Sequence, residues 1–167
     1  MSAGVTNVTS SEMNKTGKLS VHVSRFIRAP RERVFEAWIK PELRRQWWRS
    51  DKGEHLTACE IDARVGGRYC QKQIGGCDAS DTANDYEWIM EGEFTEVVSP
   101  ERLVFTWNVN HPDEPESTEV VTVEFLEVDG GTEVVIAHSG ILSTRLRDGT
   151  DKGWTTLMET LAAVLEG

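Results

Sequence analysis

The sequence predicts an α+β protein in which a curved antiparallel sheet of six to seven strands lies around one long C-terminal helix. Three observations predict this class. Strand-like alternation of apolar and polar residues recurs through the middle of the chain, two short proline-started helices follow the first strand, and one apolar helical face closes the sequence. Because a single helix cannot fill the space inside such a sheet, we expect an internal cavity between helix and sheet.

The N-terminal eighteen residues differ in composition from the rest of the chain. They are mostly Ser, Thr, Asn, Gly and Lys, which bury little surface, so residues 1–18 are predicted to be a disordered or loosely attached tail. Residues 19–167 then form a single domain. No apolar run has the length of a membrane span, and the N-terminus lacks the apolar core of a secretory signal, so we expect a cytoplasmic protein.

The first strand and the two short helices are predicted from residues 19–48. Residues 19–27 alternate between apolar and polar, as in a strand with one buried face. Pro30 and Pro41 each suit the first position of a helix, where the missing N–H costs nothing. Apolar residues recur at helical spacing after each proline, and they are Val34, Phe35, Trp38, Leu43 and Trp47. We expect the two helices to form a wedge that plugs one end of the sheet.

The remaining elements follow from alternation and from turn residues. The predicted strands are 59–62, 68–74, 88–98, 102–109, 120–128 and 132–138. Glycine pairs after Val65 and Asp129 suit hairpin turns, whereas residues 75–87 and 110–117 have the composition of loops. The C-terminal helix is predicted to begin near Gly153. Its apolar face consists of Trp154, Leu157, Met158, Leu161 and Leu165.

The formal net charge of the chain is −10. Phosphate groups repel a protein of this charge, so we expect neither nucleic acid nor an anionic membrane as a partner. The one basic cluster contains Arg44, Arg45 and Arg49. It is too short to reverse the net charge, and we expect it on the solvated face of the second helix.

The three cysteines are predicted to be reduced thiols. Cys59, Cys70 and Cys77 are odd in number and have no C-x-x-C spacing, as expected of a cytoplasmic protein without a disulfide framework. A zinc site built from them and His55 is the alternative, but the spacings of 11 and 7 residues match no common ligand pattern. The sequence contains no P-loop, no G-x-S-x-G and no H-E-x-x-H motif. We therefore expect no metal and no other cofactor.

Short motifs follow one another in a characteristic order across residues 19–166. They are Ala29-Pro30 with Val34, Trp38, Pro41 and Trp47-Trp48; Asp62 and Val65-Gly66-Gly67; Gly92 to Val98; Pro100-Glu101-Arg102-Leu103; Phe105-Thr106-Trp107; Gly131-Thr132; His138-Ser139-Gly140; and Gly153-Trp154. In these motifs the chain resembles the AHSA family, the homologues of the heat-shock-chaperone ATPase activator. That family is part of the SRPBCC (START/birch-pollen-allergen-like) superfamily. The resemblance implies a helix-grip fold with a hydrophobic cavity beneath the C-terminal helix.

The resemblance also implies a class of function. It favours binding of a small hydrophobic or aromatic molecule in the internal cavity, with the ligand unnamed. The alternatives are an enzyme similar to polyketide cyclases and dehydratases, and an adaptor that acts with a chaperone ATPase. The eukaryotic namesakes carry a separate N-terminal chaperone-binding domain where this chain has its polar tail, so we do not expect a chaperone partner. A homodimer is compatible with the sequence.

Two polar residues are predicted to share apolar faces of strands. Arg25 has the parity of the apolar residues in the first strand, where it could anchor a ligand carboxylate or phenolate. Its alternative role is a structural ion pair with Asp62 or Glu93. His138 is placed by parity to face the helix, where it could act as a general base or a ligand anchor. Its alternative role is that of a hydrogen-bonded core histidine.

Five tryptophans, at positions 38, 47, 88, 107 and 154, are predicted to face inward. They could line a pocket for a flat apolar ligand, or they could simply fill a large core. Alternation does not decide which face Tyr69 occupies. The predicted cavity residues are Arg25, Trp38, Trp47, Trp88, Phe105, Trp107, His138, Trp154 and Met158. No residue is predicted to be catalytic, and the sequence favours a binding protein over an enzyme.

Overall fold

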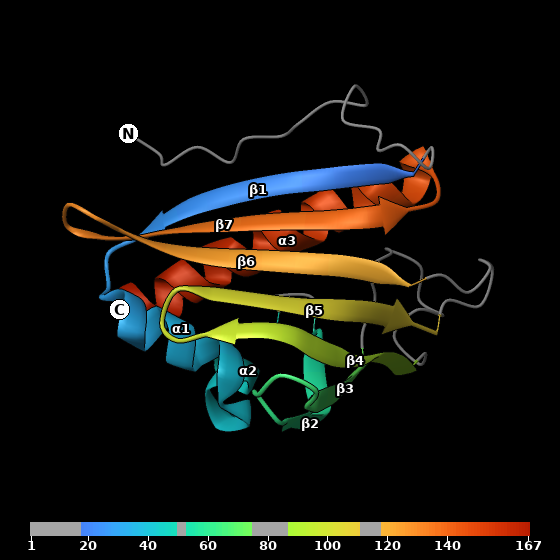
Figure 1. Ribbon diagram of the computed structural model, residues 1–167, viewed down its shortest axis with the longest axis horizontal. Coiled ribbons are helices and arrows are strands. Elements are labelled where there is room, and N and C mark those ends of the chain that lie inside the picture. Colours follow the sequence, from blue (N-terminus) through green and yellow to red (C-terminus); the bar gives the residue numbers. More distant parts are fainter. Residues whose placement is uncertain (1–17, 50–52, 75–86, 111–117) are drawn as a thin grey trace.

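Seven antiparallel strands form one curved sheet, and the helices of the described residues lie against one of its faces (Figure 1). The computed structural model describes residues 18–49, 53–74, 87–110 and 118–167. The strands are β1 (Leu19–Ile27), β2 (His55–Ile61), β3 (Arg68–Ile74), β4 (Glu87–Val98), β5 (Arg102–Val109), β6 (Glu119–Val128) and β7 (Gly131–Ile141). The helices are α1 (Arg31–Ile39), α2 (Pro41–Trp47) and α3 (Thr144–Glu166). This arrangement confirms the predicted α+β class, the helix-grip architecture and the wedge of two short helices after the first strand.

The strand order in the sheet is β1-β7-β6-β5-β4-β3-β2. Strands β2 to β7 are therefore a simple meander, and β1 joins its far edge by pairing with β7. Two predicted boundaries are wrong. β2 begins at His55, four residues before the predicted start, and β7 continues to Ile141 rather than ending at His138. Gly140 has a φ of 90°, which explains why residues 139–141 carry no clear strand signal.

Helix α3 begins at Thr144, nine residues before the predicted start at Gly153. Its first residues are mostly polar, and glycine weakens a helix interior, so this segment shows no apolar periodicity. The Ser143 side chain caps the helix by accepting a hydrogen bond from the backbone N–H of Leu146 at 3.2 Å. None of the helices in the described residues combines the length and the apolarity that crossing a bilayer requires.

The two prolines occupy different positions at their helices. Pro30 is the N-cap of α1, with extended backbone angles, and lies one residue before the predicted position. Pro41 is the first residue of α2, as predicted. The guanidinium of Arg33 donates to the backbone carbonyl of Leu165 at 2.9 Å, which fastens the start of α1 to the end of α3. The helical wedge is thereby tied to the C-terminal helix at one end of the sheet (Figure 1).

Candidate functional site: a tryptophan cluster between sheet and helices

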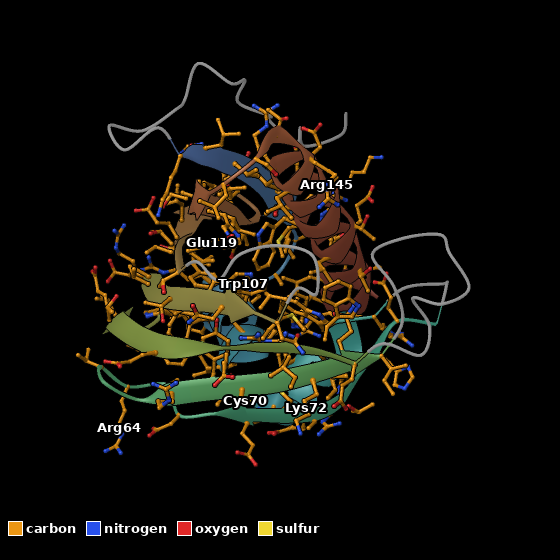
Figure 2. The ribbon with its side chains drawn as sticks, turned by 90° about the vertical axis from the view of Figure 1, so that its right-hand side faces the viewer. Arg64, Cys70, Lys72, Trp107, Glu119 and Arg145 are labelled. Carbon is orange, nitrogen blue, oxygen red and sulfur yellow. The ribbon has the colours of Figure 1, made fainter. Side chains whose placement is uncertain are left out.

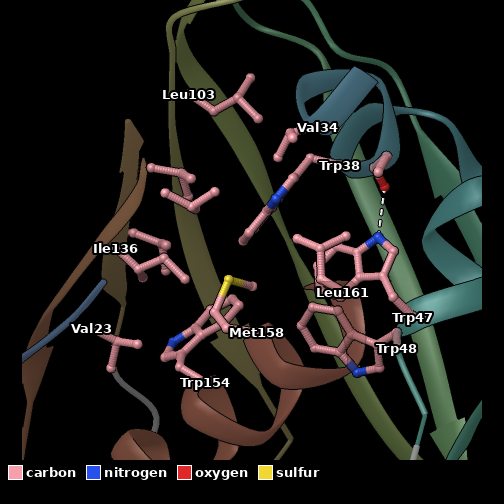
Figure 3. Close-up of a cluster of buried hydrophobic side chains, with 14 of the residues drawn as sticks. Val23, Val34, Trp38, Trp47, Trp48, Leu103, Ile136, Trp154, Met158 and Leu161 are labelled. Carbon is pink, nitrogen blue, oxygen red and sulfur yellow. Dashed lines mark hydrogen bonds between the residues drawn. The ribbon is translucent and has the colours of Figure 1, made fainter. Parts of the chain in front are cut away.

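Five tryptophan rings meet where α1, α2 and α3 face the sheet, and Figure 3 labels Trp38, Trp47, Trp48 and Trp154 among the buried side chains. We call this set the tryptophan cluster; it consists of Trp38, Trp47, Trp48, Trp107 and Trp154. The ring of Trp38 stacks on that of Trp154 with centroids 5.7 Å apart, and Trp48 lies 5.7 Å from Trp154 and 6.1 Å from Trp107. The Trp47 indole N–H donates to the Ala37 carbonyl at 2.8 Å, and this bond connects α2 to α1 within the wedge. The cluster thus joins α1 and α2 to β5 and α3, which lie much later in the sequence.

His138 lies beside Trp107 and Trp154 of this cluster and is almost fully buried. The indole N–H of Trp154 donates to His138 Nδ1 at 2.9 Å, and His138 Nε2 lies 2.6 Å from a carboxylate oxygen of Glu119. An indole N–H can only donate, so Nδ1 must be the acceptor and the proton of the neutral ring must sit on Nε2, where it is donated to Glu119. The edge of the imidazole also packs against Trp107, with centroids 5.4 Å apart. Figure 2 shows Trp107 and Glu119 on the side of the sheet that faces α3.

Both ring nitrogens of His138 are therefore occupied. A general base needs a free nitrogen within reach of the substrate proton, and this histidine offers none in the observed arrangement. The bonds instead tie the middle of α3 to β7 and β6. Of the two roles considered for His138, its geometry favours that of a hydrogen-bonded core histidine.

Arg44 is buried, with 3% of its surface exposed, so its predicted place on the solvated face of α2 is wrong. Its guanidinium donates twice to the Trp38 carbonyl and once, at 2.8 Å, to Gln71 Oε1. The centre of the guanidinium also lies 5.5–5.6 Å from the rings of Trp38, Trp47 and Trp48. Helix α2 has only seven residues, and the fold turns the side chain of its fourth residue, Arg44, inward to cap the end of α1. Burial lowers the pKa of this guanidinium.

Two buried glutamines on β3 complete the polar part of the site. Gln71 lies opposite Met90 in the β3–β4 register, and Gln73 lies opposite Trp88. The indole N–H of Trp48 donates to Gln73 Oε1 at 2.9 Å. Gln71 thus holds Arg44 and Gln73 holds Trp48. The inward face of β3 therefore positions both the guanidinium of Arg44 and the indole ring of Trp48.

The other predicted cavity residues divide into two groups. Met158 lies one turn after Trp154 on α3 and is fully buried within the cluster, and Trp88 is half-buried at the end of the sheet beside Gln73. Phe105 is buried in a second aromatic group with Tyr69 and Phe94, at centroid distances of 5.4 and 5.7 Å. The five predicted tryptophans do face inward, but Phe105 is not part of the tryptophan cluster.

Arg25 is half-buried on the inward face of β1 and lies away from the cluster. It pairs with Val134, four residues before His138 on β7, which corresponds to about 13 Å along the strand. The alternative role, an ion pair with Asp62 or Glu93, is not formed among the described residues: Asp62 binds Arg64, and Glu93 faces Arg68. Arg25 Nε has no hydrogen-bond partner in the described part of the chain.

Sequence reasoning missed four residues of the site: Arg44, Trp48, Gln71 and Gln73. The chain leaves α2 at Trp48, whose non-helical backbone (φ −88°, ψ 71°) lets its ring join the ring of Trp47 although consecutive helical residues point apart. The strand 68–74 is polar on both faces, so alternation could not reveal that its glutamines are buried. The same uncertainty concerned Tyr69, which lies inward and donates to the Thr106 carbonyl at 2.6 Å.

Two hollows occur among the described residues, and the first of them borders the tryptophan cluster at Trp47. One, of about 110 Å³, lies between the helices and is lined by residues that include Arg33, Leu43 and Val164. The other, of about 400 Å³, lies on the surface between α1 and the turn at Ser99-Pro100. The cluster rings pack against one another at centroid distances of 5.0–6.1 Å, so the described side chains fill the space where we expected a cavity.

The cysteines that the structure describes are free thiols. Cys59 is buried on β2, Cys70 is partly exposed on β3, and Cys77 lies outside the described residues. Within the described ranges, no group of three or more His, Cys, Asp or Glu side chains is arranged to hold a metal ion. The alternative of a zinc site therefore gains no support from Cys59, Cys70 and His55, the members of that site that the structure describes.

Comparisons with known proteins agree with this architecture. A family model described as "Activator of Hsp90 ATPase homolog 1-like protein" matches residues 28–166. The chain belongs to this family. The match contains both helices of the wedge, the strands from β2 to β7 and the whole of α3. Its members share the fold of the SRPBCC proteins, which commonly bind hydrophobic ligands. No curated protein matches the chain.

Solved structures of this fold come from several bacteria. Protein CV1439 from Chromobacterium violaceum is 24% identical, with a TM-score of 0.77 over 89% of this chain and 97% of the other. Protein Ms6760 from Mycobacterium smegmatis is 17% identical, with a TM-score of 0.75 over 99% and 97% of the two chains. The AHSA1 protein from Silicibacter pomeroyi is 21% identical, with a TM-score of 0.72 over 88% and 97%. At these identities the likeness extends to the fold alone.

Proposed function

We propose that this protein binds a small, flat, mainly apolar molecule at the tryptophan cluster. The observation that carries the proposal is the placing of five indole rings around buried hydrogen-bonding groups, which are Arg44, Gln71, Gln73 and His138. Ring faces bury a large area with little loss of side-chain entropy, and a few placed polar groups orient a ligand. A core that served packing alone would not need to bury these polar groups at a cost in desolvation.

Entry is proposed at the end of the sheet where Trp88 and Trp107 are half-buried. These are the least buried of the inward-facing tryptophans, and each lies near the end of its strand. Because the described side chains fill the interior, binding requires the rings to separate. The ligand would then replace ring–ring contacts with ring–ligand contacts. This is binding by induced fit, in which the free protein remains closed.

The enzymatic alternative has less support. A cyclase or dehydratase needs a free acid or base in the pocket, and the two nitrogens of His138 are already bonded to Trp154 and Glu119. The free thiols of Cys59 and Cys70 fit the cytoplasmic location that we propose.

A fluorescent neutral probe, N-phenyl-1-naphthylamine, tests the proposal directly. We expect saturable fluorescence enhancement, accompanied by quenching of the protein's own tryptophan emission. Trp107→Leu should weaken the probe's affinity by about tenfold, because one stacking surface is lost. The matched control is Leu126→Ala, which removes an exposed apolar side chain from the outer face of β6 and should leave binding unchanged. Absence of saturable binding, or equal weakening by both substitutions, would exclude a site at the cluster.

Native mass spectrometry of protein purified from its own host provides the complementary measurement. A retained small molecule that is lost in Trp107→Leu would support the proposal and supply the ligand's mass.

A further inference from the structure

We propose that Arg44 and Gln71 form an anion-binding subsite at the inner end of the tryptophan cluster, so that the bound molecule is an aromatic or apolar acid. The inference rests on the proposed function and names the class of ligand. The partner group would be a carboxylate, whose two oxygens match the geometry of a guanidinium. It is carried by two observations: a buried positive charge without a counter-ion, and buried N–H groups in excess of their acceptors.

The first observation is the missing counter-ion. Within the described ranges, the groups that accept from the buried guanidinium of Arg44 are neutral: the Trp38 carbonyl and the Gln71 side-chain oxygen. None of the ion pairs among the described residues includes Arg44. Three indole faces offset part of the cost of burying the charge, but they do not neutralise it. A carboxylate beside the guanidinium would neutralise this charge.

The second observation is the excess of donors. The guanidinium has five N–H groups and makes three hydrogen bonds in this structure. The amide nitrogen of Gln71 has two N–H groups. It donates to the thioether sulfur of Met90 at 3.6 Å, and a thioether is a weak acceptor. Both side chains are at least 97% buried, so water does not readily supply the missing acceptors. Buried donors of this kind are usually paired.

The position of these donors fits a ligand lying in the cluster. The Trp48 ring lies 5.5 Å from the centre of the guanidinium, and its centroid lies 6.1 Å from that of Trp107 and 5.7 Å from that of Trp154. A flat acid inserted beside Trp48 would therefore place its ring against Trp107 and Trp154 and its carboxylate toward Arg44. Met90, an unbranched and adaptable side chain, lies next to Gln71 and could yield its place to the carboxylate.

The test compares two probes of equal shape, 2-naphthoate, which is ionised at pH 7, and its neutral counterpart 2-naphthamide. Affinities would be measured by tryptophan quenching and by calorimetry with the full chain. The wild-type protein should bind the acid at least about tenfold more tightly than the amide, because charge-assisted hydrogen bonds are the stronger ones. Arg44→Met should remove this preference, because it should weaken binding of the acid at least about tenfold more than binding of the amide. The matched control is Arg45→Met, at the adjacent exposed arginine of α2, which should keep the preference.

The possible results separate the two proposals. Equal binding of acid and amide by the wild-type protein would overturn the anion subsite and leave the apolar binding site standing. Binding of neither probe would overturn both. A preference retained in Arg44→Met would show that another group recognises the acid. Should Arg44→Met fail to fold, Gln71→Leu removes a donor without removing the cap on α1, and it should reduce the preference for the acid severalfold; an unchanged preference would count against the subsite.

Discussion

The indole N–H of Trp154 donates to Nδ1 of His138 at 2.9 Å, and this bond connects the middle of α3 to β7, the strand between β1 and β6. Because the other imidazole nitrogen faces Glu119, one hydrogen-bonded chain runs from α3 through β7 to β6. The cluster is therefore held by directional bonds as well as by ring packing. A substitution that removes a ring should therefore change the stability of the cluster differently from one that removes only a hydrogen bond.

Trp154→Phe keeps an aromatic ring but removes the only donor to His138 Nδ1. We expect the free energy of unfolding to fall by about 1–3 kcal/mol, because a buried acceptor is left unpaired. In a His138→Leu background the same change should cost less, giving a coupling energy of about 0.5–3 kcal/mol between the two sites. Urea denaturation of the four proteins measures this coupling. Identical costs in the two backgrounds would show that the bond contributes nothing.

Tyr69 provides a pH-dependent prediction. Burial raises the pKa of its phenol, which also donates to the Thr106 carbonyl at 2.6 Å. The native state therefore keeps a proton that the unfolded chain releases near pH 10, so stability is full below that pH and falls as the pH rises above it. In Tyr69→Phe, stability at pH 8 should be lower by about 0.5–1.5 kcal/mol, because one hydrogen bond is lost. The gap between the two proteins should narrow above pH 10. A constant gap across the alkaline range would contradict this role for the phenol.

Two glycines should respond to alanine in opposite directions. A Cβ added at Gly92 on β4 would lie 1.9 Å from the Thr106 carbonyl oxygen, a backbone atom that cannot move aside. Gly92→Ala should therefore cost about 1–3 kcal/mol or more. A Cβ at Gly153, in the interior of α3, meets nothing within 4 Å, so Gly153→Ala should stabilise the protein by about 0.5–1 kcal/mol. Thermal unfolding of both variants decides this, and a shift of the same sign in both would refute the argument.

Thiol reactivity should distinguish the two described cysteines. Burial raises the pKa of the Cys59 thiol, and burial together with the charge of Glu91 raises that of Cys70. Since the thiolate is the reactive species, alkylation at pH 8 should be slower at both sites than for a free thiol, and the rate at Cys70 should still be rising above pH 9. Cys59 should react only after unfolding, because it is buried. Iodoacetamide labelling followed by peptide mass spectrometry resolves the sites, and rapid native labelling of Cys59 would contradict the predicted burial.

The faces of the strands could largely be predicted from the sequence, whereas the polar part of the site could not. Alternation places Trp88, Met90 and Phe94 on one face of β4 because one side of an antiparallel sheet is buried and the other is wet. The prediction fails where a polar residue is buried for a tertiary reason. Arg44 follows no apolar pattern; it is inside because the end of α1 and the side chain of Gln71 meet it there. Nothing in a local window of sequence contains that information.

Helix ends present the same difficulty on a smaller scale. Trp48 was not predicted to join the site because its neighbour Trp47 occupied the apolar face of the helix. The helix ends between the two, and the change in backbone direction turns both rings inward. Boundaries of this kind depend on the packing of the surrounding chain and are the least predictable feature of a sequence.

The pairing of β1 with β7 also concerns the order in which the chain is made. Residues 19–27 pair as a strand with residues 132–141, which are synthesised more than a hundred positions later. At ordinary rates of translation, β1 leaves the ribosome about 5–25 s before its partner exists. During that time it is an unpaired apolar strand, and the sheet between β2 and β7 can form without it. We therefore expect β1 to join last, as the strand that closes the sheet when synthesis is nearly complete.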